Sequence, residues 1–281
     1  VVKSDRVIPD AKLPLEALKV LDGRLQLHAD RILLPALDMQ NFEGEIRIQD
    51  GHVLADPVTF QSGEGSFEGR TVLRQVPDGA VISLNLRVED IELKAMRSAG
   101  EIKSLLTGIL NVEADMTGRG RSVSELLGSL NGRWVDIASD GRIANRYFAP
   151  FLLNPNVRGT ILRSVNPAYK MQEYTEFNCR ANQFEIEAGV ATWSGFLDTD
   201  LVYLAAGGTI DLSTERIDIA ANPRPKEGVG FQQIGQVTFN LAELTKPFKI
   251  TGTLANPTIG LAPSRAFSTI AKALGGFLLL G

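Results

Sequence analysis

The sequence predicts a mainly β protein built around a long antiparallel sheet, with a few short helices. Apolar and polar residues alternate over several stretches, most regularly over residues 81–89. Such alternation indicates strands with one dry and one wet face, whereas strands of a parallel sheet are covered on both faces and form continuous apolar runs. Four Asp-Gly pairs and one Asn-Gly pair also favour tight hairpins, because these pairs tolerate positive φ.

The alternating stretches are the candidate strands, and their apolar members form the candidate binding face. The stretches cover residues 24–29, 45–49, 81–89, 110–117, 209–212 and 216–219. In a closed sandwich or barrel the apolar members are the core, which composition alone favours. In an open, one-sided sheet the same aliphatic residues would accept acyl chains. The candidate lipid-contacting residues are Ile46, Ile48, Ile82, Leu84, Leu86, Val88, Leu110, Val112, Ile210, Leu212, Ile217 and Ile219.

Three stretches predict helices between or after the strands. Residues 90–107 space Leu93 and Met96 as a helix does, and residues 265–280 resemble a terminal amphipathic helix. Ser122 followed by Glu125 is a capping box, in which a serine oxygen accepts an N–H at the helix start. Residues 146–170 have no assignment, and residues 222–230 are expected to form an exposed loop. With no convincing linker, residues 1–281 are expected to form a single β-rich region.

The chain offers few side chains for chemistry. It has one cysteine, Cys179, and two histidines, His28 and His52, which exclude a disulfide framework and a zinc site of the Cys/His type. We expect Cys179 to be structural and the histidines to lie at the surface. Aspartates at 136, 140, 198 and 200 lie in strand and turn contexts where this residue normally caps or is solvated. The sequence therefore predicts no catalytic residues, no metal and no cofactor.

Charge is distributed unevenly along the chain. The net charge of −4 gives no reason to expect nucleic acid as a partner. Residues 117–172 nevertheless carry a net charge of +5, including Arg119 and Arg121 just before the predicted helix at Ser122. Two interpretations stay open, a surface that contacts anionic lipid headgroups and a solvated basic face balanced by the fold. Arg119 and Arg121 are the candidate headgroup contacts.

The chain of 281 residues begins with Val1 rather than methionine, so we expect a segment of a longer protein without its targeting sequence. Its longest apolar stretches, such as residues 275–281, are far shorter than the roughly 20 residues that a membrane-spanning helix needs.

Several motifs in order resemble the C-terminal region of AsmA-like proteins. Residues 8–32 contain a Pro-Leu-x-x-Leu turn at Pro14 and then Leu-Asp-x-x-Leu-x-Leu-x-Ala from Leu21. A run over residues 48–69 ends in Gly63-x-Gly-x-x-x-Gly69, and Gly118-x-Gly-x-Ser-x-x-Glu-Leu-Leu follows. Residues 177–189, 198–212 and 250–257 match the last third of the family pattern. The resemblance spans nearly the whole chain.

The resemblance implies a curved one-sided sheet that forms a groove or open half-barrel. It also implies a periplasmic protein of Gram-negative bacteria, anchored in the inner membrane by an N-terminal helix, which we expect to lie outside this segment. Members of the family take part in outer-membrane biogenesis and in phospholipid transport between the two membranes. The resemblance supplies no catalytic residues. We therefore expect a non-enzymatic segment that binds phospholipid acyl chains. The alternative is an assembly or scaffold factor that binds outer-membrane proteins through its sheet edges.

Overall fold

The computed structural model describes most of the chain. The described residues are 6–34, 37–93, 97–98, 101–102, 106–144, 174–200, 202–226, 233–234, 237–238 and 247–261. The expected terminal helix at 265–280 and the unassigned residues 146–170 lie outside these ranges.

Within the described residues, secondary structure is mostly strand, with two short helices. The helices are α1 (Leu15–Leu18) and α2 (Val123–Gly128). The first strands are β1 (Gly23–Leu34), β2 (Leu37–Gln49), β3 (His52–Ser62), β4 (Gly65–Val76), β5 (Gly79–Leu93), β6 (Arg97–Ser98), β7 (Glu101–Ile102), β8 (Leu106–Gly120) and β9 (Asn131–Ala144). The later strands are β10 (Tyr174–Glu187), β11 (Val190–Asp198), β12 (Val202–Asp211), β13 (Arg216–Pro225), β14 (Gln233–Ile234), β15 (Val237–Thr238), β16 (Phe248–Thr253) and β17 (Pro257–Leu261).

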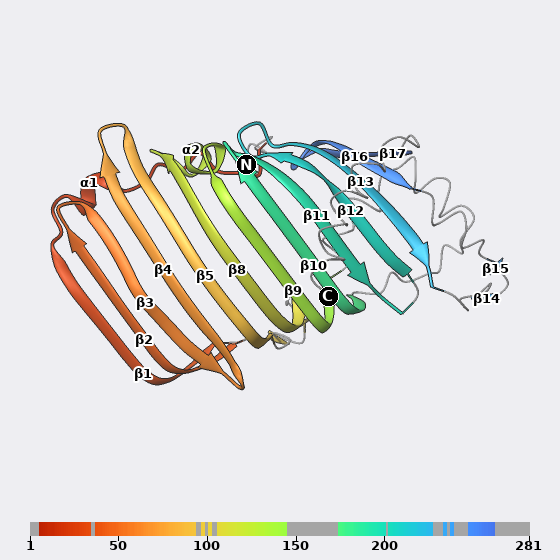
Figure 1. Ribbon diagram of the computed structural model, residues 1–281, viewed down its shortest axis with the longest axis horizontal. Helices are drawn as coiled ribbons and strands as arrows, with labels where there is room; N and C mark the ends of the chain where they lie inside the picture. The colour runs from red at the N-terminus through yellow and green to blue at the C-terminus, as the bar shows by residue number, and fades with distance from the viewer. Residues whose placement is uncertain are drawn as a thin grey trace.

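The strands form one long, unclosed antiparallel sheet, which confirms the predicted fold class (Figure 1). Thirteen strands pair in the order β1-β2-β3-β4-β5-β8-β9-β10-β11-β12-β13-β16-β17, so each strand lies beside its predecessor in the sheet. β6 with β7, and β14 with β15, form two separate two-stranded ribbons. Among the described elements, the extensive contacts of each sheet strand are with its neighbours in the sheet, and α2 packs against β8. The described part of the sheet is therefore a single layer.

The Asp-Gly pairs have two different roles in the sheet. Asp50 and Gly51 have φ of 50° and 74° and form the hairpin turn between β2 and β3, as predicted. In the next hairpin the turn residues are Pro77 and Asp78, and Gly79 begins β5 opposite Val76. Asp140, in contrast, lies within β9 with a φ of 50°. It lies where the register of β9 against β8 shifts, so this pair forms a bulge rather than a turn.

Bulges recur near one end of the strands and help to curve the sheet. The register shifts between β2 and β3, between β5 and β8, and between β8 and β9. Asn41 and Asp90 lie at two of these shifts, each with a φ of 50°. A bulge bends its strand and increases the local twist. Repeated bulges therefore favour a curved sheet over a flat one.

The prediction of a helix over residues 90–107 is wrong for the part that the structure describes. β5 continues to Leu93, β6 and β7 follow, and β8 begins at Leu106. The bulge at Asp90 lets β5 stay paired, so that Ile91 lies opposite Leu110 and Leu93 lies opposite Gly108. The expected loop at 222–230 is also wrong at its start, because β13 extends to Pro225.

The capping-box prediction is confirmed at α2. Ser122 has extended backbone angles, and its Oγ accepts a hydrogen bond from the Glu125 N–H at 3.3 Å. Glu125 Oε2 in turn accepts from the Arg121 N–H at 2.7 Å. Both short helices lie at the same end of the strands (Figure 1). No helix within the described residues is long and apolar enough to cross a membrane.

The segment before β1 runs along the end of the sheet at which the helices lie (Figure 1), and we call residues 6–22 the strap. Its start is held by Glu215, which precedes β13. Leu13 then pairs through its backbone with Arg121, beside α2. Gln75 of β4 donates to the Leu15 carbonyl at 2.6 Å. The strap thus connects turns from both halves of the sheet.

Candidate functional site

One side of the sheet carries an apolar residue at almost every second position. Directly opposed residues of antiparallel strands point to the same side, so the register shows which residues share a face. One row of opposed residues from β2 to β13 is Ile46, Ala55, Thr71, Leu84, Met116, Gly132, Ile186, Ala191, Ile210 and Ile217. The next row, from β3 to β16, is Val58, Gly69, Leu86, Ala114, Trp134, Phe184, Trp193, Gly208, Ile219 and Ile250.

Three further rows complete what we call the apolar face. The row beyond Leu86 is Phe60, Phe67, Val88, Val112, Asp136, Asn182, Gly195, Ala206, Ala221 and Phe248. Beyond the bulge at Asp90 the row is Ile91, Leu110, Ala138, Arg180, Leu197 and Leu204. Nearest the helices the row is Ile48, Val53, Leu73, Ile82 and Gly118.

Eleven of the twelve predicted lipid-contacting residues lie on this one face. The alternation predicts which residues of one strand share a side. The register shows that the apolar sides of neighbouring strands face the same side of the sheet. Leu212 has no register partner, because it lies in the turn just after β12, where its N–H donates to the Gly189 carbonyl at 2.8 Å. The face therefore gathers residues that lie as far apart in the sequence as Ile46 and Ile219.

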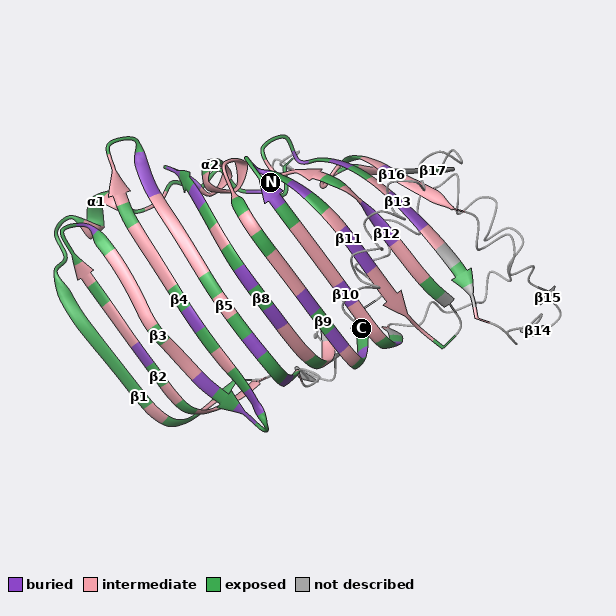
Figure 2. Ribbon diagram, in the orientation of Figure 1, coloured by how far each residue is buried: buried purple, intermediate pink, exposed green. Residues whose placement is uncertain are grey.

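Many residues of the apolar face remain partly exposed to solvent. Val88 and Val112 are 7% exposed and Ile217 is 6% exposed, whereas the other predicted residues are half-buried. Figure 2 shows buried positions spread along the central strands and long exposed stretches on β1 at the edge. On β1, Leu25 lies opposite Ile46 and remains 51% exposed. A half-buried aliphatic surface of this size is unusual for a closed core.

A compact apolar cluster lies on this face toward the bulged end of the strands. Phe60, Val88, Ile91 and Val112 form its buried centre. The rings of Phe60 and Phe67 stack with centroids 4.5 Å apart. This cluster stabilises the first half of the sheet by burial of apolar area.

The apolar face also holds a polar cluster that sequence reasoning missed, and we call Asp136, Arg180 and Asn182 the ion-pair cluster. Asp136 is only 7% exposed, and its Oδ2 lies 2.6 Å from Arg180 Nη2. Trp134 donates through Nε1 to Asp136 Oδ1 at 2.9 Å. Sequence alone treated Asp136 as a solvated strand-end residue. Arg180 and Asn182 lie on another strand, more than 40 positions away, so no local signal could identify these two partners.

The other predicted side chains lie away from the apolar face. Arg119 lies opposite Val81 on the polar face of the sheet, and its Nη2 is 3.7 Å from Asp78 Oδ2. Arg121 follows β8 and is exposed. Cys179 lies opposite Ser139 and Asp198, also on the polar face. Neither arginine therefore lies among the predicted acyl-chain contacts.

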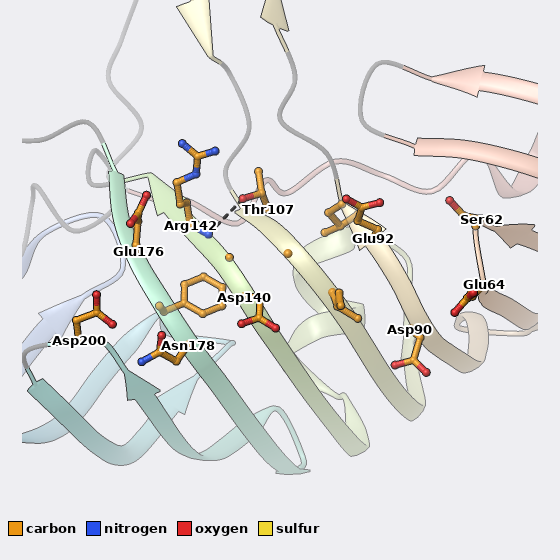
Figure 3. A pocket seen from close by; sticks show the side chains of 16 residues that line it. Ser62, Glu64, Asp90, Glu92, Thr107, Asp140, Arg142, Glu176, Asn178 and Asp200 are labelled. Atoms are coloured by element: carbon orange, nitrogen blue, oxygen red, sulfur yellow. Dashed lines mark hydrogen bonds between the residues drawn. The ribbon is translucent and has the colours of Figure 1, made fainter.

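A polar pocket of about 940 Å³ opens at the end of the strands opposite α2 (Figure 3). Six of its sixteen lining residues carry carboxylates, including Glu64, Asp90 and Asp140, and its arginine is Arg142. The Arg142 N–H donates to Thr107 Oγ1 at 3.2 Å, as the dashed line in Figure 3 marks. The concentration of negative charge makes this pocket a poor place for an anionic headgroup. The candidate site is accordingly the apolar face and not this pocket.

Comparisons with known proteins give the family. A family model described as the AsmA family matches residues 3–195. The AsmA family protein YhjG of Escherichia coli (strain K12) is 23% identical over 276 residues, which cover 96% of this chain and 37% of that protein. No solved structure matches this chain. Because the family model covers more than half of the chain, the protein belongs to the AsmA family.

Proposed function

We propose that the apolar face binds phospholipid acyl chains, and that the protein is a non-enzymatic lipid-bridging segment in transport between the inner and outer membranes. The observation that carries the proposal is the continuity of the face, since rows of opposed apolar residues run across successive strands from β2 to β13. Each methylene moved from water onto this surface contributes about 0.8 kcal/mol. Several strands side by side therefore offer a path along which acyl chains move without entering water.

Family membership supports the cellular setting of the proposal. AsmA family membership suggests a role in outer-membrane biogenesis or lipid transport, and proteins of the family are generally membrane-associated. We propose that the sheet lies in the periplasm, with the whole protein anchored in the inner membrane. This chain corresponds to 37% of the length of its E. coli relative, so the anchor and the route of transport concern the whole protein.

A photo-reactive side chain at Leu84 or Val112 tests the proposal directly. Leu84 is half-buried on the apolar face, and Val112 is nearly covered on the same face. In cells, each is expected to crosslink to phospholipid, identified by mass spectrometry of the adduct. The matched controls are Asn85 and Glu113, one residue further on each strand and on the polar face. Crosslinks from Leu84 and Val112 to protein alone would refute acyl-chain binding.

A charge on the apolar face gives a second test. Leu84→Asp places a carboxylate between Thr71 and Met116, where an open face lets it reach water. We expect the variant to fold, with a circular dichroism spectrum like that of the wild type, and to lose most co-purifying lipid. Asn85→Asp adds the same charge to the polar face and is expected to retain lipid. Unfolding of Leu84→Asp would indicate a closed dry core, because an unpaired buried charge is very unfavourable.

One observation favours a second function, strand addition to an outer-membrane protein. Among the described strands, β1 pairs only with β2, so its twelve residues present one free edge. Leu25 and Leu27 are 51% and 45% exposed on this strand. An extended segment with apolar residues at alternate positions would continue the apolar face from this edge. Gln26→Lys, opposite Glu45 on the polar face, would add a charge at this edge, weaken such pairing and leave the apolar face unchanged, which separates the two functions in a binding assay with an isolated β-barrel protein.

A further inference from the structure

The ion-pair cluster lies in the middle of the apolar face, where charge is unexpected. By register, Asp136 lies between Val112 and Asn182, and Arg180 lies between Ala138 and Leu197. The side chain of Asp136 is 9% exposed and that of Arg180 is 20% exposed. Charged side chains are rarely this covered unless they are paired or have a function.

Asp136 is well satisfied by its neighbours. Its Oδ1 accepts from Trp134 Nε1 at 2.9 Å, and its Oδ2 accepts from Asn182 Nδ2 at 3.0 Å and lies 2.6 Å from Arg180 Nη2. Asn182 is held in turn, because its Oδ1 accepts from Trp193 Nε1 at 3.2 Å. The carboxylate is thereby fixed in position, and it fixes the arginine.

The guanidinium of Arg180 has fewer of its hydrogen-bond donors paired than Asp136 has acceptors. A guanidinium carries five N–H donors, and Asp136 pairs with Nη2. The Nε of Arg180 is buried and has no hydrogen-bond partner. A buried donor without a partner is unfavourable and requires an explanation in a native structure. An oxyanion is the group that a guanidinium binds best.

We propose that Arg180 binds the oxyanion of an amphiphile whose hydrocarbon chain lies on the apolar face. The oxyanion is a carboxylate or a phosphate, the chemistry shared by free fatty acids and phospholipids. Asp136 and Asn182 act as positioning residues, which hold the guanidinium at the level of the surrounding aliphatic side chains. This inference rests on the proposed function, and it adds a fixed polar contact to a face otherwise suited to hydrocarbon.

The test compares ligands that share their chains and differ only in the anionic group. The purified protein is incubated with oleate or methyl oleate, and separately with dioleoylphosphatidylglycerol or dioleoylglycerol, and bound ligand is counted by native mass spectrometry. At least one anionic ligand is expected to bind tenfold or more tightly than its neutral analogue, which corresponds to about 1.4 kcal/mol. The pair that shows this preference identifies the carboxylate or the phosphate as the group bound.

Two variants attribute the preference to Arg180. Arg180→Gln is expected to reduce the ratio to about one while the neutral analogues still bind. Arg180→Gln alone leaves Asp136 buried without its ion-pair partner and could prevent folding. The double variant Asp136→Asn with Arg180→Gln removes both charges together and avoids this. The matched control is Arg133→Gln, which removes an arginine from the polar face beside Glu185 and is expected to keep the ratio.

The outcomes separate the two proposals. Equal binding of anionic and neutral ligands by the wild type would overturn the role of Arg180 and leave the lipid-binding function standing. If the folded double variant no longer binds the neutral ligands, the role of Arg180 would also be overturned. The ion-pair cluster would then serve only to maintain the structure of the apolar face. Binding of none of the four ligands would overturn both proposals.

Discussion

Cys179 shows how burial decides the chemistry of a single side chain. Burial raises the pKa of its thiol, and Asp198 raises it further. Since the thiolate is the reactive form, a raised pKa makes this cysteine a poor nucleophile at neutral pH. We expect Cys179→Ser to change the free energy of unfolding by less than about 1 kcal/mol and to leave lipid binding intact. Denaturant unfolding measures the free energy of unfolding, and native mass spectrometry measures lipid binding. Loss of lipid binding in a folded variant would contradict the structural role of Cys179.

At the residue scale the sequence predicts apolar positions better than polar ones. Alternation places Ile82 and Leu84 on one side of a strand because the side-chain period of a strand is two. The contact between Asp136 and Arg180 depends instead on the register between β9 and β10. Register is set by the whole sheet, so no local pattern reveals that these two residues meet.

At the scale of elements, strand pairing overrides local spacing. Residues 90–107 space their apolar residues like a helix, yet β5 continues through Asp90 because β8 is available as a partner. Asn111 of β8 fits the bulge, since its Oδ1 accepts the Asp90 N–H at 3.0 Å and its Nδ2 donates to Asp90 Oδ1 at 3.1 Å. The bulge at Asp140, unlike the one at Asp90, falls in an Asp-Gly pair. An Asp-Gly pair predicts a positive φ, and the sheet decides whether a turn or a bulge uses it.

The start of α2 is a local feature that the sequence predicts well, and it provides a test of its own. Ser122 is 4% exposed and caps the Glu125 N–H. Ser122→Ala leaves this donor without its partner and is expected to lower the free energy of unfolding by about 1 kcal/mol. Lipid binding should not change. Ser66→Ala, at an exposed position on β4, is the control and is expected to change stability by less than about 0.5 kcal/mol.

At the scale of the whole molecule, the strap joins parts of the sheet that local pairing does not connect. Glu215 is 1% exposed and binds the start of the strap. Its Oε1 accepts from Arg6 Nε at 3.0 Å and from the Ile8 N–H at 3.1 Å, and its Oε2 accepts from the Val7 N–H at 2.8 Å. These contacts span more than 200 positions, which explains why sequence reasoning did not foresee them. The strap therefore links the turn before β13 to the residues beside α2 and to the end of β4.

The contact at Glu215 predicts an acid-sensitive stability. Burial alone would raise the pKa of this carboxyl, but the hydrogen bonds from Val7, Arg6 and Ile8 outweigh burial and lower it below its ordinary value of 4.5. A lowered pKa means that the folded protein favours the ionised form, so the stabilisation is complete above pH 4.5 and is lost as the pH falls further. Asp211, beside it, keeps a pKa of about 2 through hydrogen bonds from Ser213 and Thr214, so the turn itself stays intact in this range.

The variant Glu215→Gln isolates this contribution. At pH 7 it loses hydrogen bonds to a buried charge and is expected to be about 1.5–3 kcal/mol less stable than the wild type. As the pH is lowered from 6 to about 3, the difference in stability between the two proteins should shrink, because the wild type becomes protonated while the variant does not titrate at this position. Denaturant unfolding over this pH series measures the difference, and Glu187→Gln, at an exposed position on β10, should show almost none. A constant difference from pH 6 to 3 would mean that the side-chain shape of Glu215, and not its charge, holds the strap against the sheet.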